Sequence, residues 1–444
     1  MAAAPFVRVL FAAAPVASFG AFFVGAAHAQ DAPAQEIQPA AEATVVIFNT
    51  LLFLMSGMVV MFMAAGFCML EAGMVRAKNA ATICLKNLSL YAVAGLMVWL
   101  LGYNMIYGIE PGGLLAPFAF FYQGDDGDPA GLGYGAYSDW FFQMVFVATA
   151  ASIVSGALAE RIKLFPFLIF VAILTGIVYP IVASWEWGKG YLDAEWDFAD
   201  FAGSTLVHST GGWAALAGAV VLGPRAGKYE GGRVHPIPGS SLPLATLGAF
   251  ILWLGWFGFN GGSQLAFGSI EDAFSVAKIV VNTNMAACGG VVAALLMTRF
   301  SYGKVDLTIV MNSAIGGLVA ITAQPLEPAI WQAVLIGAMG GVIVTVTVPL
   351  LDRARIDDVV GAIPAHLFCG IWGTLIVPWT EDGPTFLGQF VGVVMVGAFV
   401  TAISFLLWAV LRFTIGVRAE PEHETLGLDK SELGLEAYPE FAKG

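Results

Sequence analysis

The sequence predicts an all-α integral membrane protein with eleven transmembrane helices, arranged as an inverted repeat of two five-helix halves plus a final helix. Three observations predict this fold class. The 444 residues are 58% hydrophobic and 11% charged, whereas a soluble protein carries roughly a quarter charged residues. The apolar segments recur at the length of a bilayer-spanning helix, about 20 residues. Two of these segments contain the same pattern, D-x2-G-x4-H-x3-G.

The first 29 residues have the organisation of a cleaved secretory signal peptide (1–29). Arg8 precedes an apolar run that ends in Ala27-His28-Ala29, which fits an A-x-A cleavage site. An uncleaved first span is the alternative. With cleavage, a periplasmic segment at 30–44 would precede a transmembrane domain at 45–414, and a polar cytoplasmic tail would occupy 415–444.

Basic residues determine the predicted orientation, because Lys and Arg accumulate in cytoplasmic loops. With the N-terminus outside, only Lys189 and Lys278 fall on the outer side. The sequence therefore predicts a multi-pass protein of the bacterial inner membrane with a periplasmic N-terminus and a cytoplasmic C-terminus. The predicted spans are 45–70, 83–107, 138–158, 164–184, 204–223, 242–261, 274–298, 306–323, 329–351, 359–378 and 387–414.

The repeated pattern places one histidine in each half of the chain. An ionisable side chain inside a membrane span is costly and is therefore a candidate functional group. Because an odd number of spans per half turns the second half upside down, both histidines are expected at mid-depth, where their rings can meet. The alternative is a pair of buried polar residues that only bridge helices. The pattern comprises Asp200, Gly203, His208 and Gly212, then Asp358, Gly361, His366 and Gly370.

Aromatic residues flank the predicted outer end of the histidine spans. Interfacial Trp and Phe are ordinary membrane anchors, but an aromatic face also attracts an ammonium-like cation. Asp200 is expected to cap the helix that carries His208, and its charge would favour an arriving cation as well. The aromatic residues are Phe142, Phe146, Trp185, Trp187, Phe257 and Phe259.

The sequence lacks the motifs that are typical of several other classes of protein. There is no Walker-type phosphate loop, no GxGxxG before a helix, no HExxH and no CxxC pair. The net charge is −13, and no basic stretch interleaved with aromatic residues is present, which argues against nucleic-acid binding. We expect no enzymatic activity, no cofactor, no metal site and no disulfide among the four cysteines.

Four stretches resemble the ammonium transporters (the Amt/Mep/Rh family), in particular those of bacterial Amt type. The resemblance covers essentially the whole mature chain and extends to the tail motifs Gly427-Leu428-Asp429 and Ala437-Tyr438. The matching stretches are Phe142-Gln143-x-x-Phe146 with 156–162, the segment 200–208, the segment 255–263, and 357–374 with its Cys369-Gly370-Ile371-Trp372-Gly373-Thr374.

The resemblance implies an ammonium transporter that forms a homotrimer, with one pore per subunit and a PII-type signal protein as a cytoplasmic partner. Ammonium would bind outside, lose a proton near an aromatic gate and pass as ammonia along the two histidines, while the proton follows a relay. The implied roles are substrate binding for Phe146, Trp187 and Ser263, gating for Phe142, Phe146 and Phe259, and the pore and proton relay for His208, His366 and Asp200.

The chain departs from the family pattern near the second histidine and at the mouth. Ala365-His366-Leu367 stands where many relatives read Val-His-Gly, and Pro364 is expected to bend the span just before His366. Lys189 adds a positive charge near the mouth. Three alternative functions stay open: a redox enzyme with haem between the histidines, an ammonium sensor on the same scaffold, and a channel for neutral gas.

Overall fold

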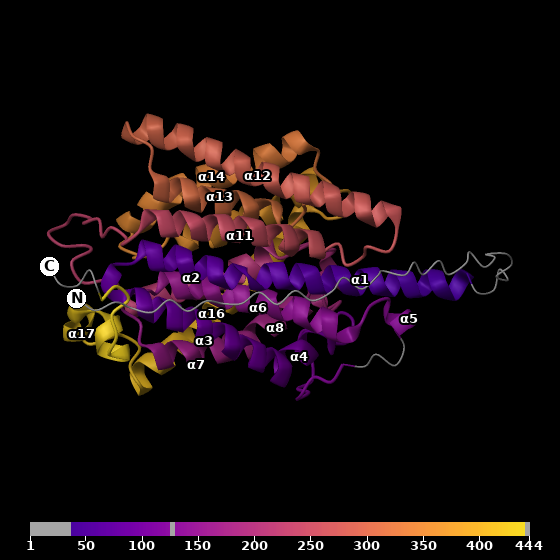
Figure 1. Cartoon of the computed structure of the whole chain (residues 1–444), viewed down its shortest axis with the longest axis horizontal. Coiled ribbons are helices and arrows are strands. Elements are labelled where there is room, and N and C mark those ends of the chain that lie inside the picture. The colour runs from indigo at the N-terminus through magenta and orange to yellow at the C-terminus, as the bar shows by residue number, and fades with distance from the viewer. Residues whose placement is uncertain (1–36, 125–128, 440–444) are drawn as a thin grey trace, which may run out of the picture. The chain divides into compact units, whose positions relative to one another are not determined.

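The computed structural model describes residues 37–124 and 129–439, so the predicted signal peptide (1–29) lies outside the described residues. Residues 42–444 form one compact unit, separate from residues 1–41. The described part of this unit is helical, and its long helices run side by side (Figure 1). Within it, the β-type pairing consists of one isolated bridge, between Ile162 and Arg418.

Nine helical stretches of the described residues are long and apolar enough to cross a membrane, and two shorter apolar helices lie at 307–321 and 363–375. These correspond in order to the eleven predicted spans, which confirms the fold class. The elements are α1 (Ile37–Met61), α2 (Met63–Met74), η1 (Ala77–Asn79), α3 (Ala80–Met97), η2 (Val98–Gly102), α4 (Tyr103–Tyr107), α5 (Pro129–Leu132), α6 (Ala136–Ala157), α7 (Leu164–Ile173), η3 (Leu174–Val178), α8 (Tyr179–Ser184), α9 (Tyr191–Trp196), η4 (Ser204–Ser209), α10 (Thr210–Leu222), α11 (Leu242–Gly262), α12 (Ile270–Tyr302), α13 (Leu307–Ile321), α14 (Ile330–Arg353), η5 (Ile363–Phe368), α15 (Cys369–Leu375), η6 (Val377–Trp379), α16 (Phe386–Thr414), α17 (Pro421–Leu426) and η7 (Asp429–Leu433).

Polar caps mark the beginning of several spans. The Ser241 hydroxyl accepts a hydrogen bond from the Leu244 backbone N–H at the start of α11. Ser269 and Asp272 form a reciprocal capping box at the start of α12. Asp306 caps α13, and Thr385 caps α16. Short oxygen-bearing side chains satisfy the backbone N–H groups that a helix leaves unpaired in its first turn.

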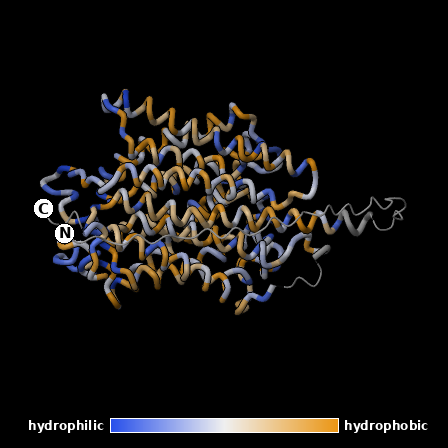
Figure 2. Tube along the Cα trace, in the orientation of Figure 1, coloured by the Kyte–Doolittle hydropathy of each residue, from blue (hydrophilic) through white to orange (hydrophobic). Residues whose placement is uncertain are grey.

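Close helix packing depends on small residues. A Cβ atom added at Gly337 of α14 would lie 1.9 Å from the Ala286 carbonyl oxygen of α12, and one added at Gly73 of α2 would lie 2.4 Å from the Ala245 nitrogen of α11. Small residues let helices approach without a hydrophobic drive between them. Hydrophobic residues extend along the helices, and hydrophilic residues gather toward the connecting segments (Figure 2).

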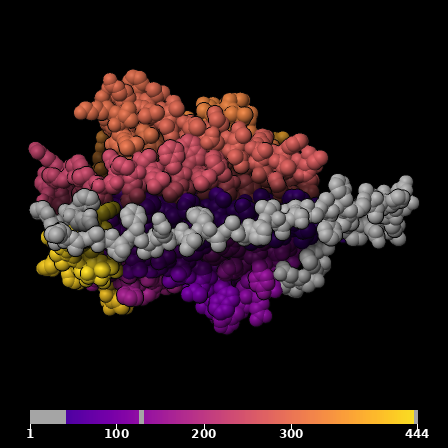
Figure 3. All heavy atoms as spheres, viewed as in Figure 1, coloured from indigo at the N-terminus to yellow at the C-terminus, as the bar shows by residue number. Residues whose placement is uncertain are grey.

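The C-terminal tail lies against the loops at one end of the unit, which we call the tail end (Figure 3). The Asp429 carboxylate accepts hydrogen bonds from the backbone N–H groups of Ala81 and Thr82, at 3.0 and 2.7 Å, and thereby caps the start of α3. The Leu428 N–H donates to Asn79 Oδ1 at 2.9 Å. The predicted polar tail is therefore a folded part of the described structure.

A buried ionic cluster lies beneath the tail. Arg225 contacts the Asp357 carboxylate through Nε at 2.8 Å and Nη2 at 2.9 Å, and Arg161 Nη2 donates to the Asp357 carbonyl oxygen at 2.6 Å. Glu160 pairs with Arg76 at 2.5 Å. Burial works to raise the pKa of Asp357, but Arg225 and Arg161 outweigh it and hold the pKa at about 2. Asp357 therefore remains charged at neutral pH.

Candidate functional site

Asp200 is the first residue of the repeated pattern and caps the segment that carries His208. Its carboxylate is fully buried and accepts hydrogen bonds from four successive backbone N–H groups, at 3.1, 2.7, 2.8 and 2.8 Å. Burial raises the pKa of Asp200 to about 6, and the four N–H groups limit that rise. Asp358 has the same place in the second half, where its carboxylate accepts from the N–H groups of Gly361 and Ile363 at 3.0 and 2.7 Å.

The glycines of the pattern have two separate structural roles. Gly203 has φ +102° and Gly361 φ +81°, a left-handed conformation that glycine adopts without a Cβ penalty. Gly212 and Gly370 allow close approach between the two halves. A Cβ atom at Gly212 would lie 2.7 Å from Leu367 Cβ, and one at Gly370 would lie 2.2 Å from the Ser204 carbonyl oxygen. The repeated pattern therefore describes two capped, closely packed segments that cross.

Each histidine lies on a π-helical segment, η4 or η5, where an ordinary α-helix was expected. The His208 N–H donates to the Gly203 carbonyl oxygen, five residues back, at 3.0 Å. Pro364, where a bend was expected, lies in the first turn of η5, where a backbone N–H would have no partner within the helix. Short π-helical turns occur frequently at functional sites because they change the direction of the side chains.

The two histidines meet. Their Nδ1 atoms lie 3.2 Å apart, their ring centroids are 5.2 Å apart, and both side chains are buried. In such a contact one Nδ1 donates a hydrogen bond and the other accepts it. Among the described residues, His208 Nε2 has no hydrogen-bond partner. That nitrogen is available to a small polar molecule.

Aromatic rings continue directly from the histidine pair. The rings of Phe146 and Phe259 are stacked with centroids 3.9 Å apart, and the Phe259 centroid lies 5.3 Å from that of His208. Phe142 contacts Phe146 edge to face at 4.8 Å. Trp187 contacts the other side of Phe146 at 6.1 Å. We call the end of the unit at Trp187 the aromatic end.

The remaining residues expected at the mouth have different surroundings. The Ser263 hydroxyl donates to the Phe259 carbonyl oxygen at 2.9 Å, so Ser263 lies one helical turn beyond the stacked rings. Trp185 packs against Phe399 instead, and its Nε1 donates to the Leu114 carbonyl oxygen. Lys189 is exposed and pairs with Asp193 at 3.1 Å, which offsets the positive charge expected there.

Comparison with known proteins identifies the family. The model of the Ammonium Transporter Family matches residues 51–438. This chain belongs to the ammonium transporter family. Ammonium transporter Amt2 of Archaeoglobus fulgidus is 39% identical over 418 residues, which cover 87% of each chain. Ammonium transporter Amt1 of Haloferax mediterranei is 36% identical and covers 88% of this chain and 80% of its own length. Family membership assigns ammonium transport across a membrane, and no enzymatic activity, to this protein.

Solved structures agree with this assignment. A protein described as a Sensor Amt Protein superposes with a TM-score of 0.82 at 34% identity, covering 88% of this chain and 99% of that chain. Mep2 of Candida albicans, at 24% identity, has a TM-score of 0.76 over 86% of this chain and 88% of its own, and shows that the fold is shared. The family fold therefore extends over the described transmembrane region.

Two residues near the site were not singled out from the sequence. Trp256 stacks on the His208 ring with centroids 5.0 Å apart, and its Nε1 donates to Thr322 Oγ1 at 2.8 Å. Glu186 lies next to Trp187, and its Oε1 accepts from the Asp200 N–H at 3.3 Å. Burial and the Asp200 charge raise the pKa of Glu186 well above its usual value. The position of Glu186 between two tryptophans that were expected at the mouth could have marked it as a candidate site residue in the sequence.

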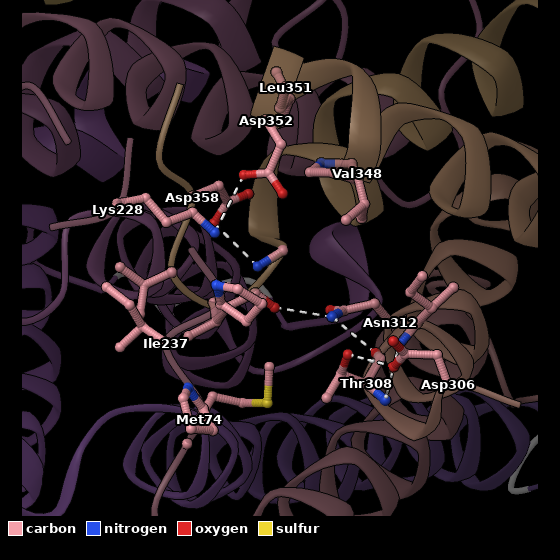
Figure 4. A pocket seen from close by; sticks show the side chains of 18 of the residues that line it. Met74, Lys228, Ile237, Asp306, Thr308, Asn312, Val348, Leu351, Asp352 and Asp358 are labelled. Atoms are coloured by element: carbon pink, nitrogen blue, oxygen red, sulfur yellow. Dashed lines mark hydrogen bonds and ion pairs between the residues drawn. The ribbon is translucent and has the colours of Figure 1, made fainter. Parts of the chain in front are cut away.

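A large cavity opens at the tail end (Figure 4). It has a volume of about 430 Å³, and its lining includes Pro364, two residues before His366. Lys228 pairs with Asp352 at 3.2 Å on one side of the cavity. On the other side, Asn312 Nδ2 donates to the Val360 carbonyl oxygen at 2.9 Å. The cavity therefore reaches η5, the segment that also carries His366.

Proposed function

We propose that ammonium enters at the aromatic end, loses a proton near the stacked rings and crosses as ammonia along the histidine pair. Phe146, Trp187 and Ser263 bind the cation, and Phe142, Phe146 and Phe259 form the gate. The observation that carries this proposal is the contact between His208 and His366, Nδ1 to Nδ1 at 3.2 Å, directly beyond the stacked gate.

Selection against other cations follows from the chemistry of the gate. Ammonium and potassium have similar size, so a pore cannot separate them by width alone. The stacked rings of Phe146 and Phe259 offer no hydrogen bonds, and a bare ion between them would lose its hydration at high cost. Ammonium alone can release a proton and continue as a neutral molecule. The aromatic faces at the mouth stabilise the cation before this step, by about 0.5 to 2 kcal/mol.

The proton travels separately through the histidines. A shared Nδ1–Nδ1 hydrogen bond lets one ring accept a proton on one side while the other ring releases one. The negative charge of the Asp200 carboxylate favours positive charge near the aromatic end. The same carboxylate also holds the backbone of the segment that carries His208. Asp200 is therefore part of the proposed relay.

We further propose that the aromatic end faces the periplasm and the tail end the cytoplasm of a bacterial inner membrane, in a homotrimer. Basic side chains concentrate at the tail end, among them Arg76, Arg161, Arg225 and Lys228, in agreement with the cytoplasmic bias of Lys and Arg. A PII-type signal protein is the proposed partner at this face. Cysteine-accessibility labelling of both ends and mass measurement of the purified assembly test these assignments.

The function is tested by reconstitution in liposomes. Ammonium-concentration jumps should give saturable currents, and equal potassium jumps should give none above protein-free liposomes. Absence of an ammonium response would contradict the proposal. A sensor is the second candidate, favoured by the likeness to the Sensor Amt Protein; ammonium binding without a measurable current would support it. Ammonia flux without charge movement would instead support the neutral-gas channel.

A further inference from the structure

A buried carboxyl group lies on the tail-end side of the histidine pair, outside the site described so far. Glu71 of α2 is 1% exposed. It lines a small cavity together with His366, Phe67 and Ser152. This cavity has a volume of about 10 Å³, about the space that one water-sized molecule requires.

The small cavity, which His366 lines, lies next to the large one. Asn312 and Val360 line both cavities, so these two residues are the boundary between them. A molecule that moved from His366 through the small cavity to the 430 Å³ cavity would pass Glu71. The packing around Glu71 is tight: a Cβ atom added at Gly156 would lie 2.5 Å from Val360 Cγ2 and 3.5 Å from Glu71 Cγ.

The two oxygens of Glu71 have unequal surroundings. Oε2 accepts from the Ser155 hydroxyl at 2.7 Å and lies 4.0 Å from Lys86 Nζ. Lys86 also donates to the Ser155 carbonyl oxygen at 2.7 Å. Oε1 is buried and has no hydrogen-bond partner of good geometry among the described residues. The neighbouring Asn87 side chain interacts with this carboxyl, but its amide nitrogen donates to the Ile83 carbonyl oxygen.

The ion pair of Glu71 and Lys86 leaves Oε1 of Glu71 without a hydrogen bond in a buried environment. A buried acceptor without a donor is costly, and a charged one more so. A charged pair inside the membrane is retained where it serves a substrate or proton pathway. The small cavity that Glu71 lines has room for one small donor, and ammonia or ammonium is such a donor. This step rests on the proposed function.

We propose that Glu71 is an inner binding site of the pathway, whose Oε1 accepts a hydrogen bond from the ammonia or ammonium that leaves His366. Lys86 and Ser155 hold the other carboxyl oxygen and so fix the direction of Oε1. The site adds a hydrogen-bond acceptor between the histidine pair and the large cavity. It thereby lowers the free energy of the transported molecule between His366 and the water-accessible end of the pathway.

The test compares ammonium currents of wild-type protein and of a Glu71→Gln, Lys86→Gln double variant in liposomes. The double change removes both charges together, which avoids an unpaired buried lysine. The maximal current should fall about tenfold, because the amide oxygen of Gln accepts only a weaker, neutral hydrogen bond in place of the charge-assisted one. The half-saturating ammonium concentration should stay unchanged, because the aromatic end sets it. Ser263→Ala should shift the half-saturating concentration, and Glu271→Gln, which changes an exposed carboxyl in α12, should change neither quantity.

The outcomes separate this site from the transport function itself. Wild-type protein without ammonium current contradicts the proposed function. A wild-type current together with an undiminished maximal current in the double variant overturns the Glu71 site, which would then hold only water. If the double variant does not fold, Glu71→Asp decides, because it keeps the charge but withdraws the carboxyl from the cavity. It should also lower the maximal current, and full activity would overturn the proposal.

Discussion

Asp200 combines a structural and an electrostatic role in a single carboxylate. Four backbone N–H groups hold it at the start of η4. The burial of this carboxylate also raises the pKa of Asp200 to about 6. Its ionisation therefore takes place in a pH range that a transport assay can reach.

Transport should weaken as the pH at the aromatic end falls through about 6. Because the pKa of Asp200 is raised to about 6, its carboxylate is charged above that pH and neutral below it, and the charge that favours the cation is lost on acidification. The pKa of an ordinary aspartate is about 4. Current should be measured at constant ammonium from about pH 8 to about pH 5, a range that brackets this pKa.

Asp200→Asn supplies the control for that pH series. Its current should be lower at neutral pH and should not fall further on mild acidification. A wild-type current that remains constant down to about pH 5 would contradict the role assigned to the Asp200 charge.

The two crossing segments, η4 with α10 and η5 with α15, form the element on which the proposed pore depends. Gly212 of α10 and Gly370 of α15 allow the segments to approach, and the distance between the histidines follows from that approach. The interior of a protein is densely packed, so an added methyl group displaces its neighbours. A methyl group at this crossing should therefore separate the rings.

Gly212→Ala should destabilise the protein by about 1 to 3 kcal/mol, the usual cost of overpacking. The new Cβ would lie 2.7 Å from Leu367 Cβ. The change should also abolish ammonium current by separating the histidines. Gly95→Ala in α3 is the matched control, because its Cβ would meet only Met144 Sδ at 3.8 Å. Thermal unfolding in detergent measures the stability; equal midpoints for both variants would show that the crossing is not tightly packed.

The sequence predicted the spans and the meeting of the two histidines, because hydropathy reports membrane length and the repeat reports equivalent positions. It did not predict the π-helical turns, since hydropathy periodicity carries no information on whether an N–H bonds four or five residues back. Glu71 was missed for another reason. Its partners Lys86 and Ser155 come from other helices, and no local pattern indicates which apolar segments pack together.

At the scale of the whole molecule, the tail fixes the loops of the tail end to one another. Asp429 caps α3, while Glu424 accepts from the Ala226 N–H at 2.7 Å and pairs with Arg418 at 2.8 Å. The tail therefore connects the start of α3 with the loop that follows α10. Both connected loops lie beside the ionic cluster of Arg225 and Asp357.

Asp429→Asn should release the tail from α3. Loss of the charged cap should cost about 0.5 to 2 kcal/mol locally, and protease should then cleave the segment after residue 415 faster than in the wild type. Glu422→Gln removes an exposed carboxyl of the same tail and should leave the cleavage rate unchanged. Equal protection of both variants would mean that other contacts hold the tail.

The most direct test of the pore is the ratio of ammonium to potassium current in liposomes, for the wild type and for His208→Ala. If two touching imidazoles conduct ammonia and its proton separately, the wild type should respond to ammonium alone. The variant should lose this selectivity by about tenfold or more, because water can fill the space left by the ring. An unchanged ratio in His208→Ala would contradict the central role of the histidine pair.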